Sequence, residues 1–249
     1  MKLSIERAWS DAIAMLRGHA EFLLPVYGLF ALVPAVAIAV LLPMEAGSSA
    51  TPQQLLEALQ AYFAANLHWL ILSGLLTAFA AATVLVTLAD PARPTVGQAM
   101  GRALALTPAF YVLTIITNII IGMGFFLLIV PGLYLLGRLT LGHVHMAAER
   151  RMNPLWALGA SWNTSSGNGW RIAFLIVLIF VVGLIAGMAA GAVFGVFGGL
   201  LGGAETARTV NIIVTTLFST ITGLIILLVQ LAAYRQLAGA PAAEASSGI

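Results

Sequence analysis

The chain of 249 residues contains no cysteine, and only 8% of its residues are charged. The absence of cysteine excludes disulfide bonds, thiolate metal sites and cysteine nucleophiles. A soluble domain carries about 25% charged residues, so this chain has too few charges to solvate a globule of its size. Its 61% hydrophobic content and its mean hydropathy of +1.02 instead predict a polytopic membrane protein.

Signals of catalysis are also missing. The sequence contains no GxSxG, HExxH or Walker motif and no close pair of carboxylates. His143 and His145 are two residues apart, so they point to different faces of a helix and do not predict a metal site. The net charge of +2 is too small to indicate nucleic acid binding. We therefore expect a protein that is not an enzyme and has no cofactor and no metal.

Long apolar segments predict the fold class. A membrane-spanning helix needs about 20 mostly apolar residues, and six segments qualify: 20–42, 67–89, 108–130, 131–148, 171–197 and 209–234. We expect an all-α bundle of six transmembrane helices in one domain, residues 1–238, followed by a disordered cytoplasmic tail, residues 239–249. Pro131 and Gly132 predict a tight hairpin between the third and fourth spans, with its turn at the outer surface. Residues 171–203 are too long for one straight crossing, so we expect this helix to tilt, to project beyond the hydrocarbon core or to break near Gly198 and Gly199.

The basic residues predict the orientation. Nine of them fall on the side of the N-terminus: Lys2, Arg7, Arg17, Arg93, Arg102, Arg150, Arg151, Arg171 and Arg235. The opposite loops contain Arg208 beside Glu45, Glu57 and Glu205. Because basic residues concentrate in cytoplasmic loops, we expect both termini in the cytoplasm. The alanine- and glycine-rich composition indicates a bacterium with a GC-rich genome, and we expect the protein in the inner membrane.

Each cytoplasmic stretch reads as a short amphipathic helix that leads into a membrane hairpin: 4–18, 95–106 and 153–164. Thr95 and Gln98 predict a capping box, and Asn153 precedes a proline at the first helical position. Small residues recur with the same spacing, as Ala8 and Ala12, Ala99 and Ala103, and Ala157 and Ser161. This pattern predicts three repeats, with coincidence in an alanine-rich chain as the alternative. A further amphipathic segment, 52–65, should lie on the external surface.

A stripe of polar residues runs along the predicted fourth span. At 100° per residue, Tyr134, Arg138, His145 and Glu149 share one face, and His143 lies on the other side. An ionisable residue inside a membrane indicates function by default, which here means a substrate or proton path. Two alternatives stay open. Arg138 can snorkel to the interface, or the stripe can hold helices together, with Asn118 on the third span as a partner. We favour the structural role.

Two further patterns concern the last two spans. Glycines recur at every fourth position, at Gly183, Gly187, Gly191, Gly195 and Gly199. Such spacing lets two helix backbones approach closely, and the partner is either the sixth span or a second copy of the chain. The lining of a pore is the less favoured alternative. The sixth span carries a row of amide, hydroxyl and phenol groups, namely Asn211, Thr215, Ser219, Gln230 and Tyr234. These groups predict contacts between helices, with the lining of a ligand path as the alternative.

The segment from Thr95 to about Ile179 resembles a known family. The resemblance is carried by Val96-Gly97-Gln98-Ala99, by Ile129-Val130-Pro131-Gly132-Leu133-Tyr134 with Arg138, by Glu149, and by Ala157, Ser161-Trp162 and Gly169-Trp170-Arg171. These motifs are similar to the membrane domain of some bacterial glycerophosphoryl diester phosphodiesterases and to YciC-like inner-membrane proteins. The resemblance implies a six-helix membrane protein of poorly defined activity. The phosphodiesterase barrel is missing, so the resemblance does not imply hydrolysis. Residues 163–167 are more polar than the family pattern.

These observations together predict a lipid-related or accessory membrane module. Four tryptophans and an arginine should lie near the headgroups, where they can sense or organise the cytoplasmic leaflet: Trp9, Trp156, Trp162, Trp170 and Arg171. The expected partners are membrane lipids, and a protein partner or a second copy of the chain is also possible. A transporter or lipid-translocating protein that uses the polar stripe is the first alternative. A membrane-embedded enzyme is the second.

Overall fold

The computed structural model describes residues 2–43, 51–89 and 95–239. All regular structure in these ranges is helical, which confirms the all-α prediction for the part of the chain described. The helices are α1 (Ile5–Gly18), α2 (Ala20–Tyr27), the π-helix η1 (Gly28–Leu32), α3 (Val33–Leu41), α4 (Pro52–Ala89), α5 (Val96–Leu127), α6 (Ile129–Leu139), α7 (Gly142–Glu149), α8 (Pro154–Thr164) and α9 (Gly169–Leu237). The predicted tail lies outside the described residues apart from Gly239, as do Arg93 and Glu45.

Four helical segments are long and apolar enough to cross a membrane. They are Ala20–Leu41, Pro52–Ala89, Val96–Leu127 and Gly169–Leu237, so the chain has the helices of a multi-pass membrane protein. The predicted fourth span is not one helix. It is divided into α6 and α7 by a turn at Thr140 and Leu141, and neither piece has the length of a span.

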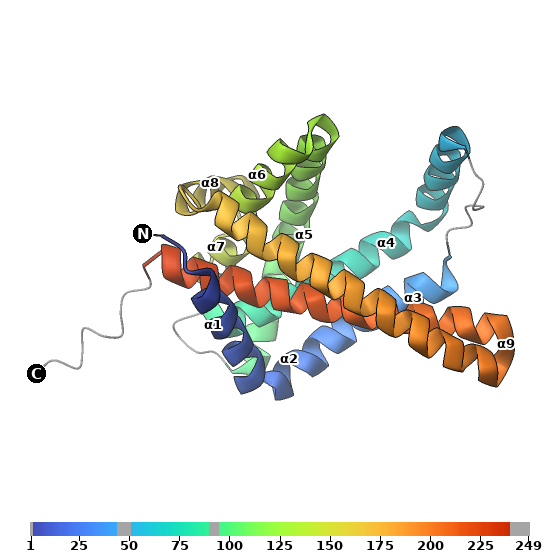
Figure 1. Ribbon diagram of the computed structural model, residues 1–249. Helices are drawn as coiled ribbons and strands as arrows, with labels where there is room; N and C mark the ends of the chain where they lie inside the picture. Colours follow the sequence, from blue (N-terminus) through green and yellow to red (C-terminus); the bar gives the residue numbers. More distant parts are fainter. Residues whose placement is uncertain (1, 44–50, 90–94, 240–249) are drawn as a thin grey trace, which may run out of the picture.

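The helix α9 contains the last two predicted spans as the two arms of a hairpin (Figure 1). The arms meet at Gly203, whose φ of 79° and ψ of −168° are not helical. Only glycine adopts this conformation at little cost. The break that the sequence places near Gly198 and Gly199 therefore falls four residues later, since both of these residues stay helical and pack against the second arm. At 1.5 Å per residue each arm is about 50 Å long.

The predicted hairpin between α5 and α6 is present, but its turn lies elsewhere. Leu128 is the extended residue between the two helices, with φ −164° and ψ 154°. Pro131 and Gly132 lie in the first turn of α6, where a proline is tolerated because it has no N–H to leave unpaired. Gly124 and Gly132 bring the helices together, since a Cβ at Gly124 would lie 2.9 Å from the Cα of Gly132.

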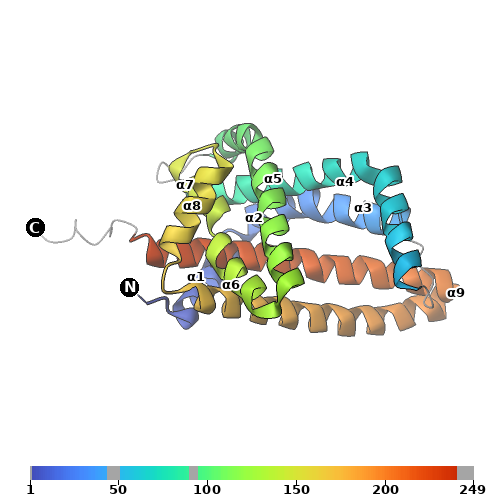
Figure 2. The ribbon, with the colours of Figure 1, turned by 90° about the horizontal axis from the view of Figure 1, so that it is seen from above.

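Two predicted surface helices are the first parts of longer helices. The segment 95–106 opens α5, and its capping box is present between Thr95 and Gln98. The segment 52–65 opens α4. Figures 1 and 2 show that α4 bends, so that its first part turns away from the direction of the rest of the helix. The predicted cap of α8 is also confirmed, because the Asn153 side chain accepts hydrogen bonds from the N–H groups of Leu155 and Trp156.

One end of the molecule gathers α1, α7, α8 and both ends of α9 (Figures 1 and 2). We call this the polar end. The N–H of Leu3 donates to Asn168 Oδ1 over 2.8 Å, and Arg171 Nη1 donates to the carbonyl of Leu3 over 2.8 Å. Arg235 Nη2 donates over 2.6 Å to the carbonyl of Leu88, in the last turn of α4. The turn of α9 lies at the opposite end.

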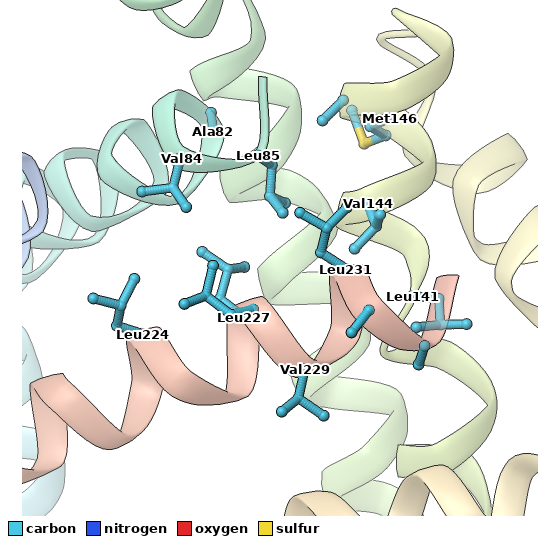
Figure 3. Close-up of a cluster of buried hydrophobic side chains, with 14 of the residues drawn as sticks. Ala82, Val84, Leu85, Leu141, Val144, Met146, Leu224, Leu227, Val229 and Leu231 are labelled. Carbon is cyan, nitrogen blue, oxygen red and sulfur yellow. The ribbon is translucent and has the colours of Figure 1, made fainter. Parts of the chain in front are cut away.

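The core of the polar end is formed by α4, α7 and the second arm of α9. Figure 3 shows Val84 and Leu85 of α4, Val144 of α7 and Leu231 of α9 converging in this cluster. The small residues of the three predicted repeats are also buried here, each at most 1% exposed: Ala8, Ala12, Ala99, Ala103, Ala157 and Ser161. Small side chains at these positions let the short helical segments pack closely against their neighbours.

Candidate functional site at the polar end

The predicted polar stripe is present as two halves that both pack against α8. Tyr134 and Arg138 lie on α6, and His145 and Glu149 lie on α7. The turn between α6 and α7 interrupts the helical register that the sequence predicts. The two halves therefore do not form one continuous row, and each makes its own set of contacts.

The α7 half is internally satisfied. His145 is buried, with Nδ1 hydrogen-bonded to Glu149 Oε1 and Nε2 hydrogen-bonded to Thr164 Oγ1, both at 2.9 Å. The Tyr234 ring of α9 packs edge-on against the imidazole at 4.8 Å. Since both ring nitrogens already have partners, His145 connects α7 to α8 and α9. This geometry favours the structural role for this half of the stripe.

The turn between α6 and α7 is held by two serines of α8. Ser161 Oγ donates to the carbonyl of Arg138 over 2.8 Å, and the N–H of Leu141 donates to Ser161 Oγ over 3.1 Å. The Ser165 hydroxyl, which has one proton, lies 3.1 Å from the same Arg138 carbonyl and 2.7 Å from the carbonyl of Ser161. From α9, Gln230 Nε2 donates to Thr140 Oγ1 over 2.6 Å. Buried backbone groups that leave a helix need such partners, so these contacts stabilise the break.

The guanidinium of Arg138 differs from the polar groups around it, which have hydrogen-bond partners. The residue is only 6% exposed, and its Nε has no hydrogen-bond partner. Among the described residues no carboxylate forms an ion pair with it. Its Cζ lies 4.3 Å from the Trp162 ring centroid and 5.8 Å from that of Tyr134. Cation–π contacts compensate part of the cost of burying a charge, but a buried unpaired donor calls for an explanation.

The rings around Arg138 reach the surface. Tyr134 is 37% exposed, Trp162 38% and Trp170 51%. The Tyr134 ring lies 5.9 Å from the Trp162 ring and 6.0 Å from the Trp170 ring. Gly169 makes room for the arginine, since a Cβ there would lie 2.9 Å from Arg138 Cδ. The charge therefore lies directly beneath a patch of three exposed aromatic rings.

Asn118, the predicted partner, does not join this site. It is exposed on α5, and no hydrogen bond of its side chain to Arg138 occurs in the described part of the chain. The polar contact from α5 is instead made by Thr114 Oγ1, which is hydrogen-bonded to His143 Nε2 at 2.9 Å. The sequence reasoning missed Thr114, Thr164, Ser161 and Ser165 as partners. A usable signal was the spacing of four between Ser161 and Ser165, which places both hydroxyls on one face of α8.

The remaining predicted interfacial residues surround the polar end. Trp9 is 42% exposed on α1. Trp156 on α8 lies beneath Arg151, whose Cζ is 4.6 Å from the ring centroid. Arg171 fastens the N-terminal segment through the carbonyl of Leu3. Together with Trp162 and Trp170, these residues form an aromatic and basic border.

A small cavity opens close to this border. It has a volume of about 200 Å³ between α4, α5 and α7, and its lining includes Val86, Arg102, Leu106, Ala147 and Arg150. Most of the lining is apolar. Two guanidinium groups beside an apolar hollow can accommodate an anionic headgroup together with part of an acyl chain.

The predicted glycine row faces the second arm of the same helix. A Cβ at Gly183 would collide with Thr222, and one at Gly191 would lie 2.7 Å from Thr215 Cγ2. Gly187, Gly195 and Gly199 face Phe218, Asn211 and Ala207. On the second arm, Thr215, Thr220 and Thr222 donate to carbonyls of their own helix. The glycines thus permit close packing of the α9 hairpin.

No group of three His, Asp or Glu residues within the described ranges is arranged to hold a metal ion. No family model matches the chain, and no curated protein or solved structure matches it. The resemblance to the phosphodiesterase membrane domains therefore stays a prediction.

Proposed function

We propose that the protein is a non-catalytic membrane protein that binds anionic phospholipid at its polar end. The observation that carries the proposal is the Arg138 guanidinium, which is buried beneath exposed aromatic rings and has no acidic partner among the described residues. A lipid phosphate would supply the acceptors that Arg138 lacks. Charge-assisted hydrogen bonds from arginine to phosphate are among the strongest in proteins.

The surroundings of Arg138 support a lipid rather than a soluble anion. Tryptophan and tyrosine concentrate at the headgroup level of membranes, and Tyr134, Trp162 and Trp170 form a group of such rings around the charge. The apolar cavity beside Arg102 and Arg150 offers a second place for a lipid at the same end. Anionic headgroups attract basic residues near the membrane surface by about 1 kcal/mol each.

The proposal includes the predicted topology, with both termini in the cytoplasm of a bacterium and the polar end in the cytoplasmic leaflet. Its support is the distribution of charge along the described helices. Arg7 and Arg17 of α1, Arg151 and Arg171 belong to the polar end, whereas Glu205 and Arg208 follow the distant turn of α9. A protein partner or a second copy of the chain stays a prediction from sequence.

The test measures thermal stabilisation by lipid. Purified protein in detergent is heated with added phosphatidylglycerol or with zwitterionic phosphatidylcholine. We expect phosphatidylglycerol to raise the unfolding temperature of the natural protein and of Arg208→Gln, in which the changed residue is far from the polar end. Arg138→Met should lose most of this gain, and Arg138→Lys should retain part of it.

Native mass spectrometry of the same proteins gives a second measurement. The natural protein and Arg208→Gln should retain anionic lipid, and Arg138→Met should retain less. An equal lipid-dependent gain in the unfolding temperature of Arg138→Met would refute the role of Arg138. If Arg138→Met also unfolds at the natural temperature without lipid, the loss is specific to binding.

A further inference from the structure

The tip of the α5–α6 hairpin is entirely apolar. Residues 119–133 contain no polar side chain. The residues around the turn are bulky and exposed, at 91% for Phe126, 71% for Leu127, 69% for Leu128 and 70% for Ile129. If this hairpin crossed the membrane, its turn would place these side chains in water at the outer surface. An exposed apolar patch of this kind instead marks a contact with membrane or protein.

The length of α6 limits how deep the tip can lie. Near the C-terminal end of α6, Gly137 packs directly against Gly169 at the start of α9. The two helices therefore lie at the same depth in the membrane at this contact, which we call the shared level. From that level Leu128 lies nine residues away, at most about 14 Å along a helix. The turn of α9 at Gly203 lies about 50 Å away along its arm, and it is followed by the charged Glu205.

The shared level lies at the membrane interface, because Trp170 and Arg171 follow Gly169 at once. The hydrocarbon core is about 30 Å thick. The α9 arm is long enough to cross it, whereas the α6 tip reaches its middle at most. The greater length of α5 does not place the tip deeper in the membrane. The first part of α5 belongs to the polar end, where Ala99 and Ala103 are buried. From Thr114, which is bonded to His143, to Leu127 the helix extends about 20 Å.

The turn between α5 and α6 leaves few backbone N–H and C=O groups without a hydrogen bond. A backbone segment in hydrocarbon must meet this condition, because no water is present to bind such groups. The N–H of Leu128 donates to the carbonyl of Gly124 over 3.0 Å, and the carbonyl of Leu128 accepts from the N–H of Gly132 over 3.3 Å. Pro131 has no N–H to satisfy. A single residue therefore reverses the chain with both of its own backbone groups bonded.

We infer that the α5–α6 hairpin is re-entrant: it enters the hydrocarbon from the polar end, its tip contacts acyl chains no deeper than the bilayer middle, and it returns to the same side. The six predicted crossings then become four, made by Ala20–Leu41, by α4 and by the two arms of α9. Both termini still lie on one side. This inference is independent of lipid phosphate at Arg138, because it concerns depth alone.

The test uses single-cysteine variants, for which the cysteine-free chain is already suited. Phe126→Cys reports the tip, Ala204→Cys reports the α9 turn, and Ser166→Cys reports the polar end. Each variant is spin-labelled in phosphatidylglycerol–phosphatidylcholine bilayers, and its collisions with oxygen and with a nickel chelate are compared. We expect oxygen to dominate at residue 126 and the nickel chelate to dominate at residues 204 and 166.

Sidedness is measured in intact cells with a membrane-impermeant maleimide. Ala204→Cys should react from outside and Ser166→Cys only after the membrane is opened, while Phe126→Cys should react in neither case. Ile129→Cys is the second reporter of the tip if Phe126→Cys does not fold. Labelling of the tip from outside, or dominance of the nickel chelate there, would overturn the inference. Neither result would alter the lipid-dependent stabilisation that tests Arg138.

Discussion

The guanidinium of Arg138 lies 4.3 Å from the ring centroid of Trp162. The helix that supplies this ring also supplies the two serine hydroxyls that bind the Arg138 carbonyl. The short helix α8 therefore contacts the Arg138 guanidinium and also stabilises the helix break that follows Arg138. This makes α8 the element through which the site can be perturbed selectively.

Trp162→Leu should destabilise the protein by about 1–2 kcal/mol, because a desolvated cation–π contact is worth about that much. The measurement is thermal unfolding in detergent without added lipid. Trp9→Leu is the control, since Trp9 is similarly exposed on α1. Equal unfolding temperatures for the two variants would mean that the ring does not stabilise the charge.

The two serines of α8 should differ in their contributions. Ser161→Ala removes an acceptor from the buried N–H of Leu141 as well as a donor to Arg138, so we expect a loss of about 1–3 kcal/mol. Ser165→Ala should cost less, about 1 kcal/mol, because Ser161 still serves the same carbonyl. The free energies of unfolding in a denaturant titration decide the order. A larger loss for Ser165→Ala would contradict this account of the break.

The same serines explain why the sequence did not predict the break. Residues 131–148 are continuous in hydropathy, and Thr140 and Leu141 are not helix breakers. The turn is stable because hydroxyls from a later helix satisfy its backbone. Sequence periodicity cannot detect a partner 20 residues away in the chain. The local signals, by contrast, succeeded: the Thr95–Gln98 capping box and the Asn153 cap depend on neighbours within three residues.

Both hairpin turns lie a few residues from the positions that the sequence indicates, for a related reason. Pro131 and Gly132 have the composition of a turn, but proline is equally suited to the first turn of a helix. In the run from Gly198 to Gly203, four glycines can adopt positive φ. Gly198 and Gly199 face the second arm, so packing holds them in the helix and the reversal falls on Gly203. The polar stripe was identified as residues, but its division into two contact sets required the fold.

Gly183→Ala should destabilise the α9 hairpin by about 1–3 kcal/mol, because the added methyl group would collide with the Thr222 side chain. Gly101→Ala is the matched control. A Cβ there meets nothing within 4 Å, and alanine in a helix is favoured over glycine by about 0.5–1 kcal/mol. Detergent-denaturation midpoints should move in opposite directions. A shift of both midpoints in the same direction would contradict the close packing of the two arms.

His145→Leu should cost about 1–3 kcal/mol, because it leaves the Thr164 hydroxyl and the Glu149 carboxylate without their shared partner. Glu149→Gln should cost under about 1 kcal/mol, since its side chain is 39% exposed and can be hydrated. Thermal unfolding of the two variants gives the comparison. If Glu149→Gln is the more harmful change, the carboxylate has a role beyond contact with His145.

Phe126→Asp distinguishes a tip in hydrocarbon from a tip in water. An aspartate at the centre of the membrane costs about 2.5–3.5 kcal/mol on insertion scales, and Phe126 is 91% exposed, so the substitution breaks few contacts within the protein. Ala204→Asp places the same charge at the turn of α9, beside Glu205, where water is expected to solvate it. Unfolding in lipid bilayers should show the loss only for Phe126→Asp. In a short-chain detergent micelle, which adapts to the protein, the difference between the variants should shrink. Equal stability of both variants in bilayers would place the tip in water and restore the crossing hairpin.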